Sequence, residues 1–255
     1  MPSIVGTPLA VSQNPSVSSV SIGGATGKAP GDRVEFRILI SGQTIATPGG
    51  WSLVSNTVIA STRRLYIFNH TVVTSGEAAT AFPFSATAQC GYAVVTLRNC
   101  DPVNPYNVVP SISQNAANQN GGVANSISPD RTGTLLIHSF HAVTVSASAT
   151  LSTPAGMTLL ASDVGDGTNG LAVALFSELR ATSGPTGTRT SSGGVAAPWG
   201  ASASAFNPYP HQGSMLPAFF GMNHHGDELA ARREEREWKQ RESGIYCRDS
   251  GLVAA

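Results

Sequence analysis

Two groups of side chains in this 255-residue chain could bind a metal ion. Asp163, Asp166 and Asn169 offer the oxygen ligands that calcium prefers, but the spacing of an EF-hand loop and its closing Glu are both missing. His224 and His225 could hold a transition metal, although adjacent histidines in a connecting segment are more often surface groups. We therefore expect neither a metal ion nor a cofactor.

One segment matches a nucleotide-binding pattern literally, the stretch Gly165-Asp166-Gly167-Thr168-Asn169-Gly170. The phosphate-binding form of this pattern needs a helix directly after it, whereas we expect a strand at Leu171, so we interpret it as a hairpin turn. His138 and His141 are three apart on an expected strand, so they point to opposite faces and do not chelate one ion. The chain has no Gly-x-Ser-x-Gly elbow, no HExxH and no Walker loop. The sequence predicts a protein that is not an enzyme.

A seven-residue stretch that could form the corner of a sheet occurs twice in the chain. Residues 48–54 (Pro-Gly-Gly-Trp-Ser-Leu-Val) recur as residues 154–160 (Pro-Ala-Gly-Met-Thr-Leu-Leu), which places Trp51 and Met157 at matching positions 106 residues apart. Pro and Gly make a tight turn, and the large apolar residue then fills the core where a strand begins. We expect Trp51 and Met157 to be the core residues of two equivalent corners.

Further matches keep nearly the same register. The same offset carries residues 65–68 onto 171–174, and a slightly longer one carries Ser75-Gly76 onto Ser183-Gly184. The 27 glycines and 16 prolines, with abundant Ser, Thr and Val, favour turns and strands over helices. We predict an all-β, jelly-roll-like β-sandwich of two related halves over residues 31–207.

Charged residues are concentrated near the end of the chain. Residues 227–249 hold 13 of the 30 charged side chains, which leaves 17 for the other 232 residues. A charge-poor body covered with Ser, Thr, Asn and Gly is typical of a surface that packs against copies or partners. It has no basic patch for nucleic acid, and no apolar run approaches the roughly 20 residues of a membrane span. Neither nucleic acid nor a membrane is expected as a partner.

The alternation of polar and apolar residues predicts how the first strands lie. Residues 1–30 are rich in Ser, Gly, Pro and Val, with one strand expected at Val17–Ile22, and we interpret them as an extended arm that leads into or lies along the main fold. Arms of this kind often pack on neighbouring subunits. Residues 33–40 alternate charged with apolar side chains, which predicts a strand buried on one face and open to solvent on the other.

A polar insertion lies between the two halves at residues 101–129. It contains six asparagines, four prolines and the pair Gly121-Gly122, and we predict a long loop. Long loops without structure of their own are usually functional or are ordered by a partner. Tyr106, Asn115 and Asn118 are its candidate interaction residues.

Residues 208–255 form a separate segment of different composition. We expect a connector and then a helix over residues 228–243, with Asp227 as its N-cap, Gly244 at its end and oppositely charged pairs four residues apart. The helix has no apolar stripe, so it is either a solvated helix or a peg that docks on another subunit. The residues that would contact the partner are Phe219, Phe220, Ala231 and Trp238.

Three cysteines are too few and too irregularly spaced for a disulfide framework. They are Cys90, Cys100 and Cys247, and the first two are expected to be reduced and partly buried. The chain begins without the basic and apolar run of a secretory signal. We therefore expect synthesis in a cytoplasm.

Several of these motifs together resemble a β-sandwich module of tailed-bacteriophage virion proteins, chiefly minor tail and tail-fibre proteins. The resemblance covers residues 30–207 in two copies. It is carried by Gly31-Asp32, residues 48–53, residues 65–68, Ser75-Gly76-Glu77 and residues 92–95.

This resemblance implies a structural virion component made in the host cytoplasm, which assembles with other virion proteins and with its own copies. The second half has Met157 in place of Trp and no Glu after Ser183-Gly184, so the resemblance assigns these positions structural roles and no catalytic residue. Two alternatives stay open. One is a capsid decoration or head-fibre protein, and the other is a module that binds carbohydrate on the host surface.

Overall fold

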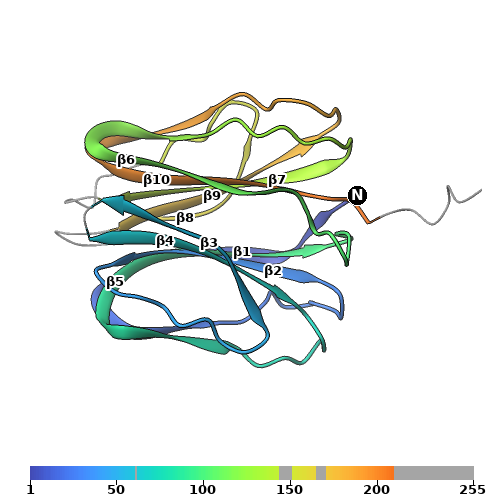
Figure 1. Ribbon diagram of the computed structural model, residues 1–255, viewed down its shortest axis with the longest axis horizontal. Coiled ribbons are helices and arrows are strands. Elements are labelled where there is room, and N and C mark those ends of the chain that lie inside the picture. Colours follow the sequence, from blue (N-terminus) through green and yellow to red (C-terminus); the bar gives the residue numbers. More distant parts are fainter. Residues whose placement is uncertain (61, 144–150, 165–170, 210–255) are drawn as a thin grey trace, which may run out of the picture. The chain divides into compact units, whose positions relative to one another are not determined.

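Strands make up all the regular structure of the chain as far as it is described. The computed structural model describes residues 1–60, 62–143, 151–164 and 171–209. The strands of these ranges form two antiparallel five-stranded sheets, which confirms the all-β prediction (Figure 1). The helix predicted over residues 228–243 lies outside the described residues.

The two sheets share one strand order. The first has the order β1-β5-β2-β4-β3 and the second β6-β10-β7-β9-β8, so each strand of the second half is the fifth one after its counterpart. The first sheet contains β1 (Ser3–Ile22), β2 (Arg33–Ser41), β3 (Trp51–Ala60), β4 (Arg63–Thr71) and β5 (Thr80–Arg98). The second sheet contains β6 (Tyr106–Ala124), β7 (Thr134–Val143), β8 (Thr158–Asp163), β9 (Leu171–Arg180) and β10 (Arg189–Phe206).

The two corners found in the sequence have the same backbone geometry. The N–H of Trp51 donates to the carbonyl of Pro48 at 3.2 Å, and the N–H of Met157 donates to the carbonyl of Pro154 at 3.2 Å. The glycine before the apolar residue has a left-handed φ of 80° in the first corner and 78° in the second. Only glycine adopts this conformation without strain, which explains why it is present in both copies.

Strand pairing corrects the sequence match beyond the corners. Leu53 lies opposite Phe68, and Leu159 lies opposite Phe176, each next to a β-bulge. Phe68 therefore corresponds to Phe176 and not to Ala174, the residue that the constant offset gave. The reason is the connection between the two strands, which is longer in the second half than in the first.

The arm predicted over residues 1–30 and the loop predicted over residues 101–129 are both wrong, whereas the strand expected at Val17–Ile22 is confirmed as part of β1. Residues 1–30 do not form an arm, because β1 pairs with β5 along its length, and residues 101–129 are not a loop, because β6 pairs with β10. Both strands are long sheet edges with prolines and register shifts, so they lack a regular alternation. The strand order also gives no support to a jelly-roll-like arrangement, because the five strands of each sheet are consecutive in the chain.

The sheets stack on each other in opposite strand order. Strand β1 contacts β8 and β9, while β3 contacts β6, so the two halves are related by an approximate two-fold axis. Each half has a core of its own, and two further apolar clusters lie between the sheets. Figure 1 shows β5 and β6 bending strongly at one end, which lets the outer part of each half cover its own core.

Strand β2 is consequently buried on both faces, and the prediction of a half-buried strand is wrong. Phe36 and Ile38 point into the core of the first half. Glu35, Arg37 and Leu39 alternate with them and are as fully buried. The second sheet covers the face that the sequence assigned to solvent.

Two glycines at matching positions allow the sheets to approach closely. Gly91 of β5 would carry a Cβ 3.1 Å from the Cβ of Leu171, and Gly200 of β10 would carry one 2.9 Å from the Cδ1 of Ile59. Both distances are shorter than ordinary carbon contacts. A side chain at either position would push the opposite sheet away.

Trp51 fills the core of the first half. Its side chain is 8 % exposed, its ring stacks on His70 at 5.0 Å, and it makes edge contacts with Phe36 and Phe82. Met157 has a similar exposure of 9 % in the core of the second half.

Replacing Trp51 with Ala should lower the free energy of unfolding by about 3–5 kcal/mol, because a buried aromatic is removed and a cavity remains. Met157→Ala should cost about 2–5 kcal/mol for the same reason. Leu53→Ala is the matched control, since Leu53 lies on the same strand but is 41 % exposed. Denaturant unfolding of the three variants checks this. Unchanged stability of Trp51→Ala would contradict the role of the corner.

Candidate functional site

A buried ion pair lies between the two sheets. Glu35 is 0 % exposed and Arg37 is 1 % exposed, and β2 directs both toward the second sheet. The Nε of Arg37 donates to the Oε1 of Glu35 at 2.6 Å, and the Nη2 forms an ion pair with the same oxygen. Burying two charges is unfavourable unless they are paired and hydrogen-bonded, so their remaining polar atoms need partners.

The second half supplies the partners of Arg37. Its Nη1 donates to the Oγ of Ser202 at 2.9 Å, and its Nη2 donates to the backbone carbonyl of Ile137 at 3.0 Å and to the Oγ of Ser204. Ser202 and Ser204 are two apart on β10, so both face the first sheet. Apart from its pairing with Glu35, the guanidinium of the first half is thus held by groups of the second.

Tyr106 completes this network on the carboxylate side. Its hydroxyl donates to the Oε2 of Glu35 at 2.9 Å and accepts a hydrogen bond from the Nδ2 of Asn69 at 3.1 Å. Burial and the neighbouring Glu35 carboxylate raise the pKa of Tyr106 well above its usual value. The residue was expected in an exposed loop, but its hydroxyl is used inside the protein.

Two histidines of β7 are buried on opposite faces of the second sheet. His138 shares its face with Leu136 and Phe140, and neither of its ring nitrogens has a hydrogen-bond partner. The Nε2 of His141 lies 3.1 Å from the Oγ of Ser139 on the face toward the first sheet. Burial, helped by the positive charge of Arg37, lowers the pKa of each histidine to about 3. Both rings are neutral at neutral pH.

The described cysteines are unreactive. Cys90 lies in the core of the first half and Cys100 lies between the sheets, and neither forms a disulfide. Burial raises the pKa of each thiol to about 12. The nucleophilic thiolate is therefore almost absent at neutral pH.

One of the predicted metal ligands falls within the described residues. The Oδ2 of Asp163 accepts a hydrogen bond from the backbone N–H of Ser12 at 2.7 Å, which ties β8 to β1. Among the described residues no group of three His, Cys, Asp or Glu side chains could hold a metal ion. The other predicted ligands, Asp166, Asn169, His224 and His225, lie outside the described residues.

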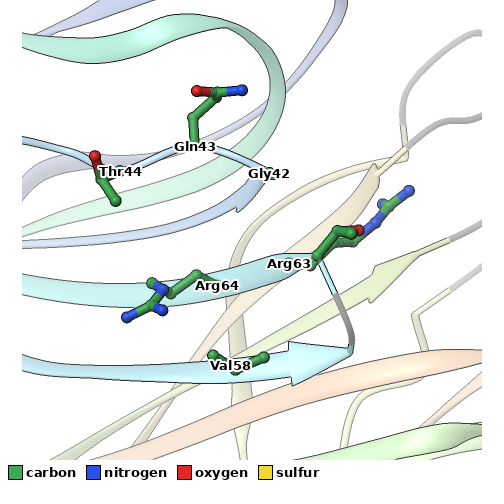
Figure 2. Close-up of a pocket in the computed structure, with 7 residues that line it drawn as sticks. Gly42, Gln43, Thr44, Val58, Arg63 and Arg64 are labelled. Atoms are coloured by element: carbon green, nitrogen blue, oxygen red, sulfur yellow. The ribbon is translucent and has the colours of Figure 1, made fainter.

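A cationic hollow opens at one end of the first sheet. Its volume is about 240 Å³, and Figure 2 shows it between the loop after β2 and the hairpin that joins β3 to β4. It is lined by Gly42, Gln43, Thr44, Val58, Thr62, Arg63 and Arg64.

The two arginines of this hollow have no acidic partner among the described residues. Arg64 donates to the Oδ1 of Asn56 at 3.3 Å, whereas the Nη1 of Arg63 is buried without an acceptor. Burial lowers the pKa of Arg63 from its usual value. Figure 2 shows the guanidinium groups of Arg63 and Arg64 leaving β4 on opposite sides. The hollow therefore carries positive charge, but its two arginines do not converge on one point to hold a ligand between them. Its chemistry suits an anionic group.

A second, neutral groove lies on the outer part of the second half. Its volume is about 360 Å³, and carboxamide and hydroxyl groups predominate in its lining. Trp199 forms its floor, 1 % exposed, and donates from Nε1 to the backbone carbonyl of Gln119 at 2.7 Å. Such a lining suits a neutral polar ligand. The lining residues are Ser113, Gln114, Asn115, Gln119, Val123, Asn125, Trp199 and Ala201.

Those predicted interaction residues whose side chains are described are not brought together by the structure. Tyr106 is in the buried network and Asn115 lines the neutral groove, while the side chain of Asn118 is not described. Trp51 and Met157 lie in separate cores. The proposed docking residues Phe219, Phe220, Ala231 and Trp238 lie outside the described residues.

Sequence reasoning missed the buried pair and the cationic hollow. Both stand out once strand pairing has aligned the two halves. Strand pairing aligns Glu35 and Arg37 with Ile137 and Ser139 of the second half, and aligns Arg63-Arg64 with Leu171-Ala172. A charged residue in one half that aligns with an uncharged residue in the other is not needed to form the shared fold. Such residues therefore indicate roles specific to one half.

The fold and these sites define an all-β protein of two equivalent sheets joined by a buried polar network. Comparison with protein-family models, with curated protein sequences and with solved structures finds no match to the chain. Within the described ranges no helix is long and apolar enough to span a membrane.

Removing one member of the buried pair should be strongly destabilising. Arg37→Met leaves the Glu35 carboxylate buried without its cation and should lower the free energy of unfolding by about 3–5 kcal/mol. The double variant Glu35→Leu/Arg37→Met should recover most of this loss, because neither charge is then buried. Denaturant unfolding gives both values. Arg131→Met removes an exposed pair with Asp130 and should change stability by less than about 1 kcal/mol. A loss in the double variant as large as in Arg37→Met would contradict this account.

The buried histidines should make the protein less stable in acid. Their folded-state pKa of about 3 lies below the ordinary 6.5, so between these values the unfolded chain binds protons that the folded chain does not. The free energy of unfolding should fall as the pH drops below 6.5, by up to about 1.4 kcal/mol per pH unit for each histidine.

His138→Phe tests this dependence, since strand pairing aligns His138 with Phe36 of the first half. The variant should lose the share of the slope that belongs to one histidine. Urea unfolding between pH 7 and pH 4, with the wild-type chain alongside, measures the difference. Parallel pH profiles of the two proteins would show that His138 does not titrate as described.

Proposed function

We propose that the protein is a non-enzymatic structural component of a bacteriophage virion, most naturally a minor tail or tail-fibre-like protein. It is made in the cytoplasm of the host and assembles with copies of itself and with other virion proteins. In this proposal the segment 208–255 docks on a neighbouring subunit through Phe219-Phe220 and through Ala231 and Trp238 of the helix expected over residues 228–243.

The duplicated module is the observation that carries this proposal. Both halves have the same strand order, the same corner turn and a core of their own, and they are joined face to face by buried groups. The motifs that resemble phage virion modules contribute core residues to the first half, among them Trp51, Phe68 and Tyr92. A duplicated module of this kind, with few charges on its strands, suits a building block of a particle.

The ionisable groups inside the protein also serve the fold. The Glu35 carboxylate and the Arg37 guanidinium join the sheets, and the rings of His138 and His141 are held neutral by burial. These roles favour a structural protein over a catalyst. A position in the head, as a decoration or head-fibre protein, is supported by the same observations and is separated from a tail position only by experiment.

A carbohydrate-binding module of the host-recognition type is the second candidate, and the neutral groove favours it. Carboxamide groups both donate and accept hydrogen bonds, as the hydroxyl groups of a sugar require. Gln114 and Gln119 lie in this groove and are exposed. Glycan-array binding that is lost in Gln114→Ala/Gln119→Ala would favour this candidate.

Immunogold electron microscopy of purified phage particles tests the virion proposal. Antibodies against the protein should label the tail of intact particles, and antibodies absorbed with the purified protein should give no label. Label on the head would favour the decoration alternative. Particles that carry no label and contain no peptide of the chain by mass spectrometry would refute a virion role.

A further inference from the structure

The charges of this protein are distributed over its strands in an unusual way. The edge strands β1, β3 and β6 contain no Asp, Glu, Lys or Arg, and the edge strand β8 contains only Asp163. Five of the six inner strands, β2, β4, β5, β9 and β10, carry charged residues, and only β7 has none. Proteins normally place charges on sheet edges, because a charged edge does not pair with the strands of other molecules. The edges here lack that protection.

Three of the four edges have other protection. Strand β1 contains Pro8 and Pro15, and β6 contains Pro110. Proline has no backbone N–H to donate, and the pairing of both strands also shifts in register, so neither edge offers a continuous row of hydrogen-bonding groups. Strand β8 has only six residues and ends at Asp163. Strand β3 has ten residues with neither proline nor charge, and its outer edge pairs with no strand of the described residues. It is the edge most open to pairing.

The exposed side chains of β3 are arranged for pairing with a copy of itself. Leu53 is 41 % exposed and Val58 is 42 % exposed. They lie opposite Phe68 and Arg64, which are four apart on β4, so both point to the same face of the sheet. Because of the bulge after Leu53, they are placed symmetrically about Asn56, which lies opposite Tyr66, midway between Phe68 and Arg64.

We propose that the protein forms a two-fold symmetric dimer in which the β3 strands of two copies pair antiparallel. Antiparallel pairing about Asn56 places Leu53 of one copy opposite Val58 of the other, twice across the symmetry axis. No like charges meet along the paired edges, because β3 has none. The two first sheets then form one continuous ten-stranded sheet. This inference goes beyond the virion proposal and does not depend on it.

Disulfide trapping tests the register directly. In a full-length chain with Cys247→Ser, the double variant Leu53→Cys/Val58→Cys should give a covalent dimer under mild oxidation. Positions 53 and 58 are four ladder steps, or about 13 Å, apart along one strand, too far for a bond within one chain. Each single variant should remain uncrosslinked, since position 53 does not meet position 53 of the other copy. Equal crosslinking of the single and double variants would overturn the proposed register.

Edge lysines test the dimer by a second route. Leu53→Lys/Val58→Lys places like charges opposite each other and should weaken dimerisation by at least about tenfold in sedimentation equilibrium. Leu159→Lys is the matched control, because Leu159 occupies the position of Leu53 on β8 and is 45 % exposed. Melting curves confirm that each variant is folded. A monomeric wild-type protein, or self-association that the β3 lysines leave unchanged, would overturn the proposal.

Discussion

The contact between Glu35, Arg37 and the second sheet determines how the two halves of this protein are joined. Apolar faces alone would allow the sheets to slide, since leucine and valine side chains accept many arrangements. A buried guanidinium is less tolerant, because each donor left without an acceptor costs about 1–3 kcal/mol. Ser202, Ser204 and the carbonyl of Ile137 meet these donors in one register. The network thus selects a single stacking of the sheets.

The rest of the interface is consistent with this constraint. Gly91 and Gly200 bring the backbones close on either side of the ion pair, and each leaves space for a branched side chain of the opposite sheet, Leu171 or Ile59. The approximate two-fold relation between the halves places these contacts symmetrically. The ion pair itself is not repeated, because Ile137 and Ser139 hold the matching positions. A symmetric module has therefore been joined by an asymmetric connection.

The fold class and the repeat could be predicted from the sequence. The corner turn requires a glycine followed by a large core residue, and this local pattern is visible in the sequence of both halves. The pairing partners of β1 and β6 were not predictable in the same way. Edge strands are satisfied by hydrogen bonds on one side, so proline and bulges interrupt their alternation. The charged face of β2 was assigned to solvent for a related reason. The alternation at Glu35 and Arg37 shows two faces of a strand, but not what covers each face.

The candidate sites follow from comparing the halves rather than from motifs. Positions with the same residue type in both halves, such as the corner glycines Gly50 and Gly156, maintain the module. Positions that differ between the halves are not needed to maintain the module. A residue at such a position that lowers the stability of the fold therefore needs an explanation of its own. Arg63 has a buried donor without an acceptor, and its counterpart Leu171 shows that the module does not need a charge at this position. The charge-free edge β3 also belongs to the first half. The distinctive surfaces of the protein therefore lie mainly on its first sheet, while the second supplies the groups that hold it in place.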